Sequence, residues 1–141
     1  MSHNQRAVSF RYLVHDVDDA IGFYAKLGWE VRMHPGAGFA QLEIDGIALN
    51  LNAVGGEGGA SQMVAGDQPV PGGWNRIQLR VDDLDAQLTS LADAGIEPVD
   101  GVVAGRGGRQ ALVRDPSGNL VELFQPHSDQ NPHATADRAL C

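Results

Sequence analysis

The stretch that decides the fold occurs twice. It reads RYLVHDVDDAIGFYAKLGWEV over residues 11–31 and QLRVDDLDAQLTSLADAGIEPV over residues 78–99. At an offset of 67 residues, without gaps, Asp16 aligns with Asp83 and Gly28 with Gly95. A later pair of stretches, residues 40–51 and 111–123, aligns at an offset of 72. The chain therefore divides into two similar modules, residues 7–53 and 74–126, joined by a glycine-rich linker over residues 54–73.

Each module begins with a strand and ends with further strands. Residues 8–14 and 77–81 are rich in β-branched and aliphatic side chains, which is typical of strands. Residues 46–52 (GIALNLN) alternate apolar and polar side chains in the first module. In the second module, residues 111–113 and 119–124 are expected to form strands joined by the tight turn DPSG.

A helix is expected after the first strand of each module. An aspartate stands where its carboxylate can accept a hydrogen bond from the first helical turn, and apolar residues then recur at helical spacing. The candidate caps are Asp16 or Asp18 and Asp83 or Asp85. Gly28 and Gly95 stand where a helix favours a left-handed residue at its end. This order predicts an α+β fold in which each helix covers one face of its sheet.

Strand alternation then separates the helix-facing residues from those on the uncovered face. The residues expected to face the helices are Val8, Phe10, Tyr12, Val14, Ile47, Leu49, Leu51, Ile77, Leu79 and Val81. The residues expected on the uncovered face are Ser9, Arg11, Asn50, Asn52, Trp74, Arg76, Gln78, Arg80, Glu122 and Phe124. An ordinary solvated face would carry more Lys, Thr and Ser, whereas Arg beside Trp and Phe is typical of recognition surfaces. We therefore expect these ten residues to bind a ligand.

Composition narrows the function further. The chain has 141 residues, a formal net charge of −8 and 43% hydrophobic residues. A chain this acidic is a poor nucleic-acid binder, because phosphates attract basic surfaces. No apolar run approaches the roughly 20 residues of a membrane span, and no signal peptide is visible. Cys141 is the only cysteine, which fits a cytoplasmic protein, and residues 127–141 are expected to form a mobile tail.

The motifs together resemble a known family. Each strand is followed by an aspartate-rich helix start, and the second module closes with RDPSGNLVELF. These features resemble the vicinal oxygen chelate superfamily of glyoxalases, extradiol dioxygenases and bleomycin resistance proteins, over residues 8–126. The resemblance implies one domain over residues 1–126, in which two βαββ modules form a cupped mixed sheet that holds the active or binding site. It also implies a homodimer with shared cups.

The resemblance further indicates where a metal would bind. Members with a metal carry ligands at positions that correspond here to Ser9, Asn50, Arg76 and Glu122. Only Glu122 is a typical ligand, since a guanidinium stays protonated and offers only donors. We therefore expect no metal and no other cofactor. We expect Arg76 to form an ion pair with Glu122 instead, the alternative being two independently solvated side chains.

The other candidate motifs give no clear indication of a catalytic, metal or phosphate site. The histidines show no ligand spacing, and His34 is expected in a turn before Pro35. No Ser-His-Asp or Cys-His arrangement is readable. Residues 105–109 (GRGGR) lack the strand-loop-helix context of a phosphate loop and are expected to form a hairpin turn.

The expected function is metal-independent binding and sequestration of a planar, antibiotic-like small molecule, as in the bleomycin-resistance branch. Trp74 and Phe124 are the candidates for stacking on ligand rings, while Trp29 and Phe39 could stack or belong to the core. The arginines Arg11, Arg76 and Arg80 favour ligand oxygens locally, and the acidic surface favours the approach of a cation. The alternatives are a metal-dependent lyase, isomerase or dioxygenase, a metal-free enzyme with Glu122 as general base, and a partner-binding module with an unused cup.

Overall fold

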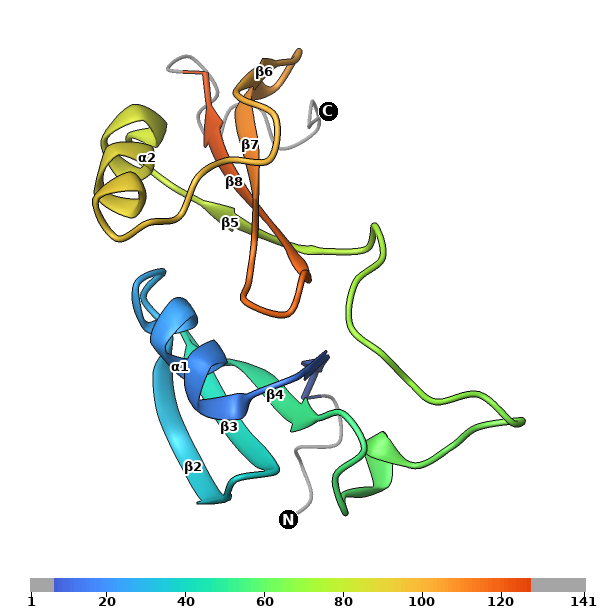
Figure 1. The fold of residues 1–141 in the computed structure, drawn as a ribbon. Coiled ribbons are helices and arrows are strands. Elements are labelled where there is room, and N and C mark those ends of the chain that lie inside the picture. The colour runs from blue at the N-terminus through green and yellow to red at the C-terminus, as the bar shows by residue number, and fades with distance from the viewer. Residues whose placement is uncertain (1–6, 128–141) are drawn as a thin grey trace. The chain divides into compact units, whose positions relative to one another are not determined.

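The computed structural model describes residues 7–127 and contains two compact units (Figure 1). The first unit comprises the described residues up to Gly73, together with Asp115–Asn119. The second comprises Trp74–Arg114 and the described residues from Leu120 onwards. Most of the expected tail, with Cys141, lies outside the described residues.

The first unit is a mixed four-stranded sheet with one helix. Its elements are β1 (Ser9–Val14), α1 (Val17–Ala25), β2 (Glu30–Gly36), β3 (Phe39–Ile44) and β4 (Ile47–Ala53), followed by the short 3-10 helix η2 (Gly59–Ser61). The strand order is β1-β4-β3-β2, with β1 parallel to β4 and the other pairs antiparallel. The helix provides the crossover that a parallel pair requires.

The second unit repeats this arrangement. Its elements are β5 (Ile77–Arg80), α2 (Leu84–Asp93), β6 (Val103–Ala104), β7 (Gly108–Arg114) and β8 (Leu120–Pro126). The strand order β5-β8-β7-β6 matches that of the first unit, again with the first and last strands parallel. The expected α+β fold with two βαββ modules is therefore confirmed, and the sequence repeat corresponds to a repeat in three dimensions.

The expected helix ends are confirmed in both modules. Asp16 accepts a hydrogen bond from the Asp19 N–H at 2.9 Å, and Asp83 accepts one from the Ala86 N–H at 3.0 Å. Gly28 and Gly95 follow the helices with φ of +97° and +85°. An L side chain would be strained at such angles, which explains why glycine stands at both positions.

Burial of the apolar side chains departs from simple alternation at some strand ends. Val14, Leu49 and Leu51 are fully buried. Val8, Phe10 and Ile47 are 64%, 44% and 40% exposed, although alternation placed them against a helix. Val8 directly precedes the edge strand β1, Phe10 lies near its start, and Ile47 is the first residue of β4. Trp29, only 4% exposed, belongs to the core of the first unit.

Other boundaries also differ from expectation. The first strand of the second module begins at Ile77 as expected, so Trp74, which strand alternation placed on the uncovered face, lies before the strand. His34 lies within β2 rather than in a turn. Residues 105–109 do form the expected hairpin turn, in which the Gly105 N–H donates to the Gly108 carbonyl at 2.8 Å. Among the described residues, no helix is long and apolar enough to cross a membrane.

The DPSGN turn between β7 and β8 is held by buried polar contacts of the first unit. The Asp115 carboxylate, in a residue only 4% exposed, accepts hydrogen bonds from the backbone N–H groups of Ser117 and Asn119 and from the Tyr24 hydroxyl. The Asn119 amide donates to the Leu13 carbonyl at 2.7 Å. Burial, followed by the nearby Asp115 carboxylate, raises the pKa of Tyr24 far above its ordinary value.

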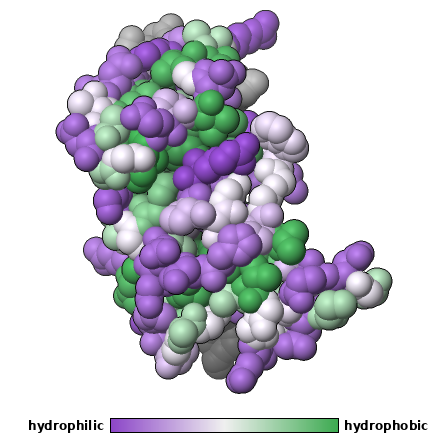
Figure 2. Space-filling model, viewed as in Figure 1, coloured by the Kyte–Doolittle hydropathy of each residue, from purple (hydrophilic) through white to green (hydrophobic). Residues whose placement is uncertain are grey.

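The surface seen in Figure 2 is mostly polar, with apolar side chains in smaller groups between polar ones. Single exposed apolar residues are normal in soluble domains. Trp74 is 70% exposed, which is unusual for the largest apolar side chain. This exposed indole therefore marks a candidate region for a binding site.

Candidate functional site

The second unit contains a compact polar network around Glu122. Arg76 Nε donates to Glu122 Oε1 at 3.0 Å, and Gln78 Nε2 donates to Glu122 Oε2 at 2.7 Å. Glu122 is only 6% exposed, so this charge is largely removed from water. The expected ion pair between Arg76 and Glu122 is confirmed.

Strand pairing explains why these side chains meet. Gln78 on β5 is the direct partner of Glu122 on the parallel strand β8, so both side chains lie on the same face of the sheet. Arg76 directly precedes β5, and its guanidinium also donates to the Trp74 carbonyl at 3.3 Å. Both oxygens of the Glu122 carboxylate therefore already accept hydrogen bonds, one of them from a cation.

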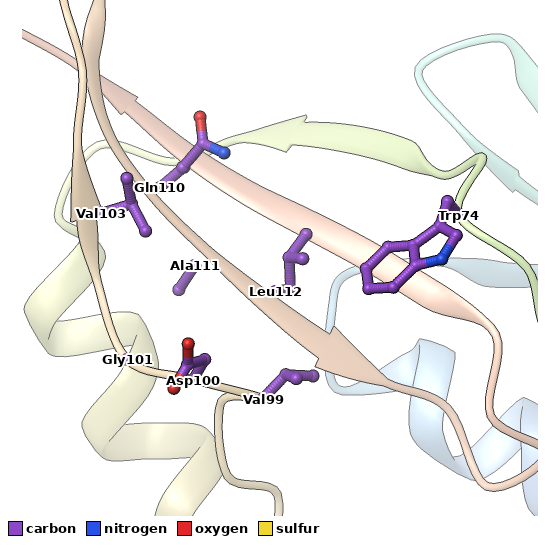
Figure 3. A pocket seen from close by; sticks show the side chains of 8 residues that line it. All are labelled: Trp74, Val99, Asp100, Gly101, Val103, Gln110, Ala111 and Leu112. Atoms are coloured by element: carbon purple, nitrogen blue, oxygen red, sulfur yellow. The ribbon is translucent and has the colours of Figure 1, made fainter.

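An apolar pocket with a volume of about 230 Å³ lies in the same unit. Figure 3 shows the side chains that surround it, from the segment before β5, the segment before β6, and strands β6 and β7. The pocket is lined by Trp74, Val99, Asp100, Gly101, Val103, Gln110, Ala111 and Leu112. Its volume lies below the roughly 300–1,000 Å³ of sites for whole drug-sized ligands, so it suits one ring system of a larger molecule.

The pocket and the polar network share one face of the second sheet. Leu112 on β7 is the direct partner of Glu122 on β8, and Gln110 is the direct partner of Phe124. Arg80 on β5 is in turn the partner of Phe124. Paired residues on neighbouring strands project to the same side. The expected site residues of the second module therefore lie on the face to which the pocket lining also belongs.

The first unit has its own polar network on the equivalent face. Arg11 donates to the Asn52 side chain at 3.0 Å, Gln41 donates to the Asn50 side chain at 2.9 Å, and Asn50 contacts Ser9 at 3.5 Å. Asn50 and Asn52 are 7% and 3% exposed. The four expected site residues of the first module thus form two hydrogen-bonded pairs, Arg11 with Asn52 and Ser9 with Asn50, on the same face of the sheet.

The side chains at the four positions that the family resemblance assigns to a metal do not suit one. In each unit the two positions are adjacent, Ser9 with Asn50 and Arg76 with Glu122. Arg76 has no lone pair to offer and occupies one Glu122 oxygen, while Asn50 offers a neutral amide engaged by Gln41. Within residues 7–127, no group of three or more His, Cys, Asp or Glu side chains is arranged to hold a metal ion.

Alternation applied only to the first and last strands of each module missed part of the site. Gln41 on β3 is the direct partner of Asn50 on β4, just as Leu112 on β7 is the partner of Glu122 on β8. Extending the alternation to β3 and β7 identifies both residues. The pocket residues Val99 and Asp100 lie in a segment without a strand pattern, so no comparable signal marked them. Phe39, the partner of Asn52, is half-buried on the polar face of the first unit.

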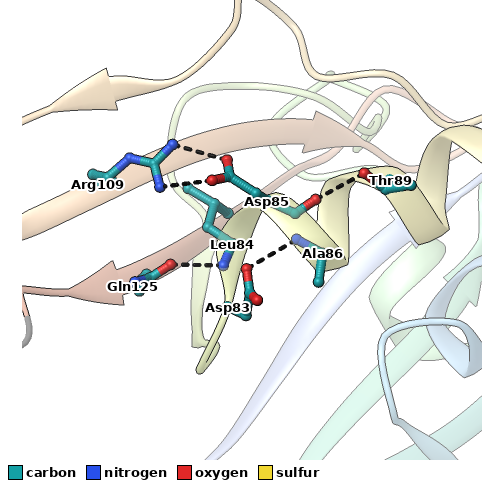
Figure 4. Close-up of polar contacts among 7 residues, drawn as sticks. All are labelled: Asp83, Leu84, Asp85, Ala86, Thr89, Arg109 and Gln125. Carbon is teal, nitrogen blue, oxygen red and sulfur yellow. Dashed lines mark hydrogen bonds and ion pairs between the residues drawn. The ribbon is translucent and has the colours of Figure 1, made fainter.

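Two further ion pairs lie away from the pocket lining. On the helix side of the second sheet, Arg109 binds the Asp85 carboxylate with both terminal nitrogens, at 2.9 and 3.3 Å (Figure 4). The Arg109 guanidinium lowers the pKa of Asp85. In the first unit, His34 contacts the Phe39 carbonyl and the Asp18 carboxylate, and these hydrogen bonds raise the pKa of His34.

Comparison with known proteins identifies the family whose sequences this chain matches. The model of the family described as "Glyoxalase/Bleomycin resistance protein/Dioxygenase superfamily" matches residues 6–123. The glyoxalase domain-containing protein RDO1 of Mycosarcoma maydis is 33% identical over 129 residues, which cover 84% of this chain and 70% of that protein.

Solved structures of similar fold carry different descriptions. TnmS3, described as an antibiotic binding protein from a Streptomyces species, is 26% identical, with a TM-score of 0.66 over 89% of this chain and 99% of its own. A lactoylglutathione lyase of Agrobacterium tumefaciens is 20% identical, with a TM-score of 0.67 over 88% of this chain and 96% of its own. At that identity the lyase is evidence for a common fold and not for a common reaction.

Proposed function

Because this chain belongs to the Glyoxalase/Bleomycin resistance protein/Dioxygenase superfamily, we propose that it binds a planar, antibiotic-like small molecule without a metal and thereby sequesters it. The similarity to an antibiotic binding protein at 26% identity supports this choice within the superfamily. Binding alone requires a shaped, partly apolar surface and no reactive group.

One observation carries the proposal. Trp74, 70% exposed, borders an apolar pocket of about 230 Å³ on the sheet face that also holds Glu122. An exposed indole offers a planar ligand a stacking surface, and stacked aromatic pairs contribute about 0.5–1.5 kcal/mol beyond the burial of area. Gln78, Arg80 and Phe124 border the same face and are the other ligand contacts that we propose in this unit.

The test uses the contrast between the two tryptophans. Trp29 is 4% exposed and Trp74 is 70% exposed, so a ligand in the pocket quenches mainly Trp74. We expect at least one planar polycyclic antibiotic in a panel to quench the fluorescence and to bind with the same affinity in the presence of EDTA. Binding that EDTA abolishes, or a panel without any binding, would contradict the proposal.

A pair of variants localises the binding. Calorimetric titration of Trp74→Leu is expected to show about tenfold weaker binding, since loss of stacking on this scale corresponds to roughly 1.4 kcal/mol. Val70→Ala is the matched control, because Val70 is 63% exposed and lies outside the pocket lining. An equal loss in both variants would argue against binding at the pocket.

The surroundings of Glu122 disfavour the enzyme alternative that sequence analysis left open. A general base must accept a proton from its substrate, but Arg76 and Gln78 already donate to the two Glu122 oxygens at 3.0 and 2.7 Å. Both carboxylate oxygens are thus engaged by donors from the protein itself and are not free to contact a proton of a substrate. Binding without turnover is therefore the simpler role for this face.

A homodimer and a cytoplasmic location remain predictions. The exposed Phe10 on the edge strand β1 and Val8 just before it offer apolar surface for a second copy of the chain. Light scattering coupled to size-exclusion chromatography would measure the oligomeric state. The monomer mass of 15.0 kDa would contradict the dimer.

A further inference from the structure

The charge of the pocket lining indicates what kind of ring system it takes. Seven of the eight lining residues are uncharged, and the eighth is Asp100. In Figure 3 the Asp100 carboxylate and the Trp74 indole lie at opposite sides of the pocket, with Leu112 and Val99 between them. The pocket therefore combines an aromatic wall, an apolar floor and one negative charge.

The neighbouring cations do not offset this charge. The Arg76 guanidinium is held by Glu122 and by the Trp74 carbonyl, and Arg109 is held by both oxygens of Asp85. Asp100 itself makes no ion pair with any residue in the described part of the chain. Sequence analysis expected a positive bias from Arg11, Arg76 and Arg80. The charge of Arg76 is offset locally by Glu122, and Arg80, on the same sheet face, does not line the pocket. The charge within the pocket lining is therefore the negative charge of Asp100.

We propose that the pocket selects an aromatic ring that carries a positive charge, with the ring against Trp74 and the cationic nitrogen near Asp100. This inference rests on the proposed function and names the ligand class for it. A cation gains from the Asp100 carboxylate by direct attraction, and an electron-rich indole attracts a cation as well. Each gain at an exposed site is modest, and together they amount to about a five- to tenfold preference over an uncharged ring of the same shape.

The experiment compares three planar tricyclic probes of different charge. Proflavine carries a positive charge, acridone is neutral and 9-anthracenecarboxylate is negative. Binding to the full chain is measured by Trp74 quenching and by calorimetry at low and at high salt. We expect proflavine to bind about five- to tenfold more tightly than acridone, the anion to bind most weakly, and the preference to shrink with salt.

Asp100→Asn tests whether the preference comes from this carboxylate. The variant is expected to lose the preference and to bind proflavine and acridone with nearly equal affinity. Glu97→Gln is the matched control, because it removes the same charge from an exposed residue of the same segment that does not line the pocket. The control is expected to keep the preference of the wild type.

The outcomes separate this inference from the function on which it rests. Equal binding of all three probes, or a preference that Asp100→Asn leaves intact, overturns the cation inference and leaves the binding function standing. An equal loss in Asp100→Asn and Glu97→Gln assigns the preference to the general negative charge and also overturns it. Failure of every probe to bind overturns the binding function and the inference together.

Discussion

Glu122 illustrates how single residues determine the character of the site. Its carboxylate is nearly buried, and Arg76 and Gln78 each hold one of its oxygens. A buried charge without partners is costly, so the stability of this face depends on its donors being present. The three side chains therefore hold one another in place by hydrogen bonds, and the Glu122 oxygens are not left open for a metal ion.

Removing the cation from this group is expected to destabilise the protein. Arg76→Met leaves the Glu122 carboxylate with one donor, and we expect the free energy of unfolding to fall by about 2 kcal/mol. Adding Glu122→Gln in the same chain removes the uncompensated charge and is expected to restore part of the loss. Urea unfolding of the two single variants and the double variant measures the coupling.

The matched control for that cycle is Arg106→Met. Arg106 is exposed in the hairpin between β6 and β7, and the substitution removes the same charge. We expect a change within about 0.5 kcal/mol. Independent, additive effects of Arg76→Met and Glu122→Gln would contradict the ion pair.

His34 makes the stability of the first unit depend on pH. Its Nδ1 lies 2.9 Å from the Phe39 carbonyl and its Nε2 lies 2.9 Å from Asp18 Oδ1. Both partners are acceptors, so only the protonated ring donates to both, and the pKa of His34 is raised by these hydrogen bonds. The stabilisation is fully present below the ordinary pKa near 6.5 and is lost as the pH rises through the raised value.

We expect His34→Gln to lower the midpoint of thermal unfolding at pH 5.5 more than at pH 8.5. His15→Gln is the control, since the His15 ring makes no hydrogen bond with any residue in the described ranges. NMR titration of the His34 ring protons would measure the pKa directly. A His34 pKa at or below the value in a model peptide would refute the arrangement.

At the scale of elements, the two helices depend on polar caps at their first turns. In α2 the Asp83 carboxylate accepts from Ala86, and the side chain of Gln125 on β8 accepts from the Leu84 N–H at 2.7 Å (Figure 4). Side-chain acceptors of this kind replace the partners that a helix start lacks. They fix where α2 begins and therefore which helix residues face the sheet.

Asp83→Ala is expected to lower the free energy of unfolding by about 1 kcal/mol, because the Ala86 N–H loses its acceptor. Asp16→Ala removes the equivalent acceptor from α1 and is expected to have a similar effect. Asp83→Ser keeps an oxygen at this position and is expected to retain most of the stability. Chemical unfolding followed by circular dichroism measures all three, and an equal loss in the alanine and serine variants would rule out capping.

Elements with local signals could be predicted from the sequence, and those without such signals could not. The helices and their terminal glycines depend on residues a few positions apart, and both helices were predicted correctly. Strand β2 was not assigned from the sequence: residues 30–34 (EVRMH) alternate polar and apolar side chains, but the pattern is short and ends at Pro35 and Gly36. Trp74 was placed on the uncovered face by extending the strand alternation, but it lies three residues before β5, in a segment whose conformation alternation does not determine, and it lines the pocket.

At the scale of the whole molecule, the two units share one strand and helix order but carry different side chains at equivalent positions. Ser9 and Asn50 in the first unit correspond to Arg76 and Glu122 in the second, and each pair is in contact. The repeat in the sequence predicted this correspondence because equivalent positions follow from the alignment. It did not predict that Gln41 contacts Asn50, that Asp100 lines the pocket, or that the DPSGN turn belongs to the first unit. These features depend on contacts between separate segments of the chain.

Substitution of Asp115 tests how much the stability of the first unit depends on that turn. The carboxylate is 4% exposed and accepts hydrogen bonds from Tyr24, Ser117 and Asn119. Asp115→Ala removes the acceptor for all of these donors, and we expect a loss of about 2–4 kcal/mol in the free energy of unfolding. Pro116→Ala, an exposed change in the same turn, is the control and is expected to cost less than about 1 kcal/mol.

The membership of residues 115–119 in the first unit has a consequence for biosynthesis. A ribosome completes the linker at Gly73 about forty residues before it reaches Asp115. At about 5–20 residues per second, the nascent first module waits several seconds for the segment that satisfies Tyr24 and Leu13. Until then the Tyr24 hydroxyl lacks its Asp115 acceptor and the Leu13 carbonyl lacks its Asn119 donor. The first module therefore completes its buried hydrogen bonds only after most of the second module has been synthesised.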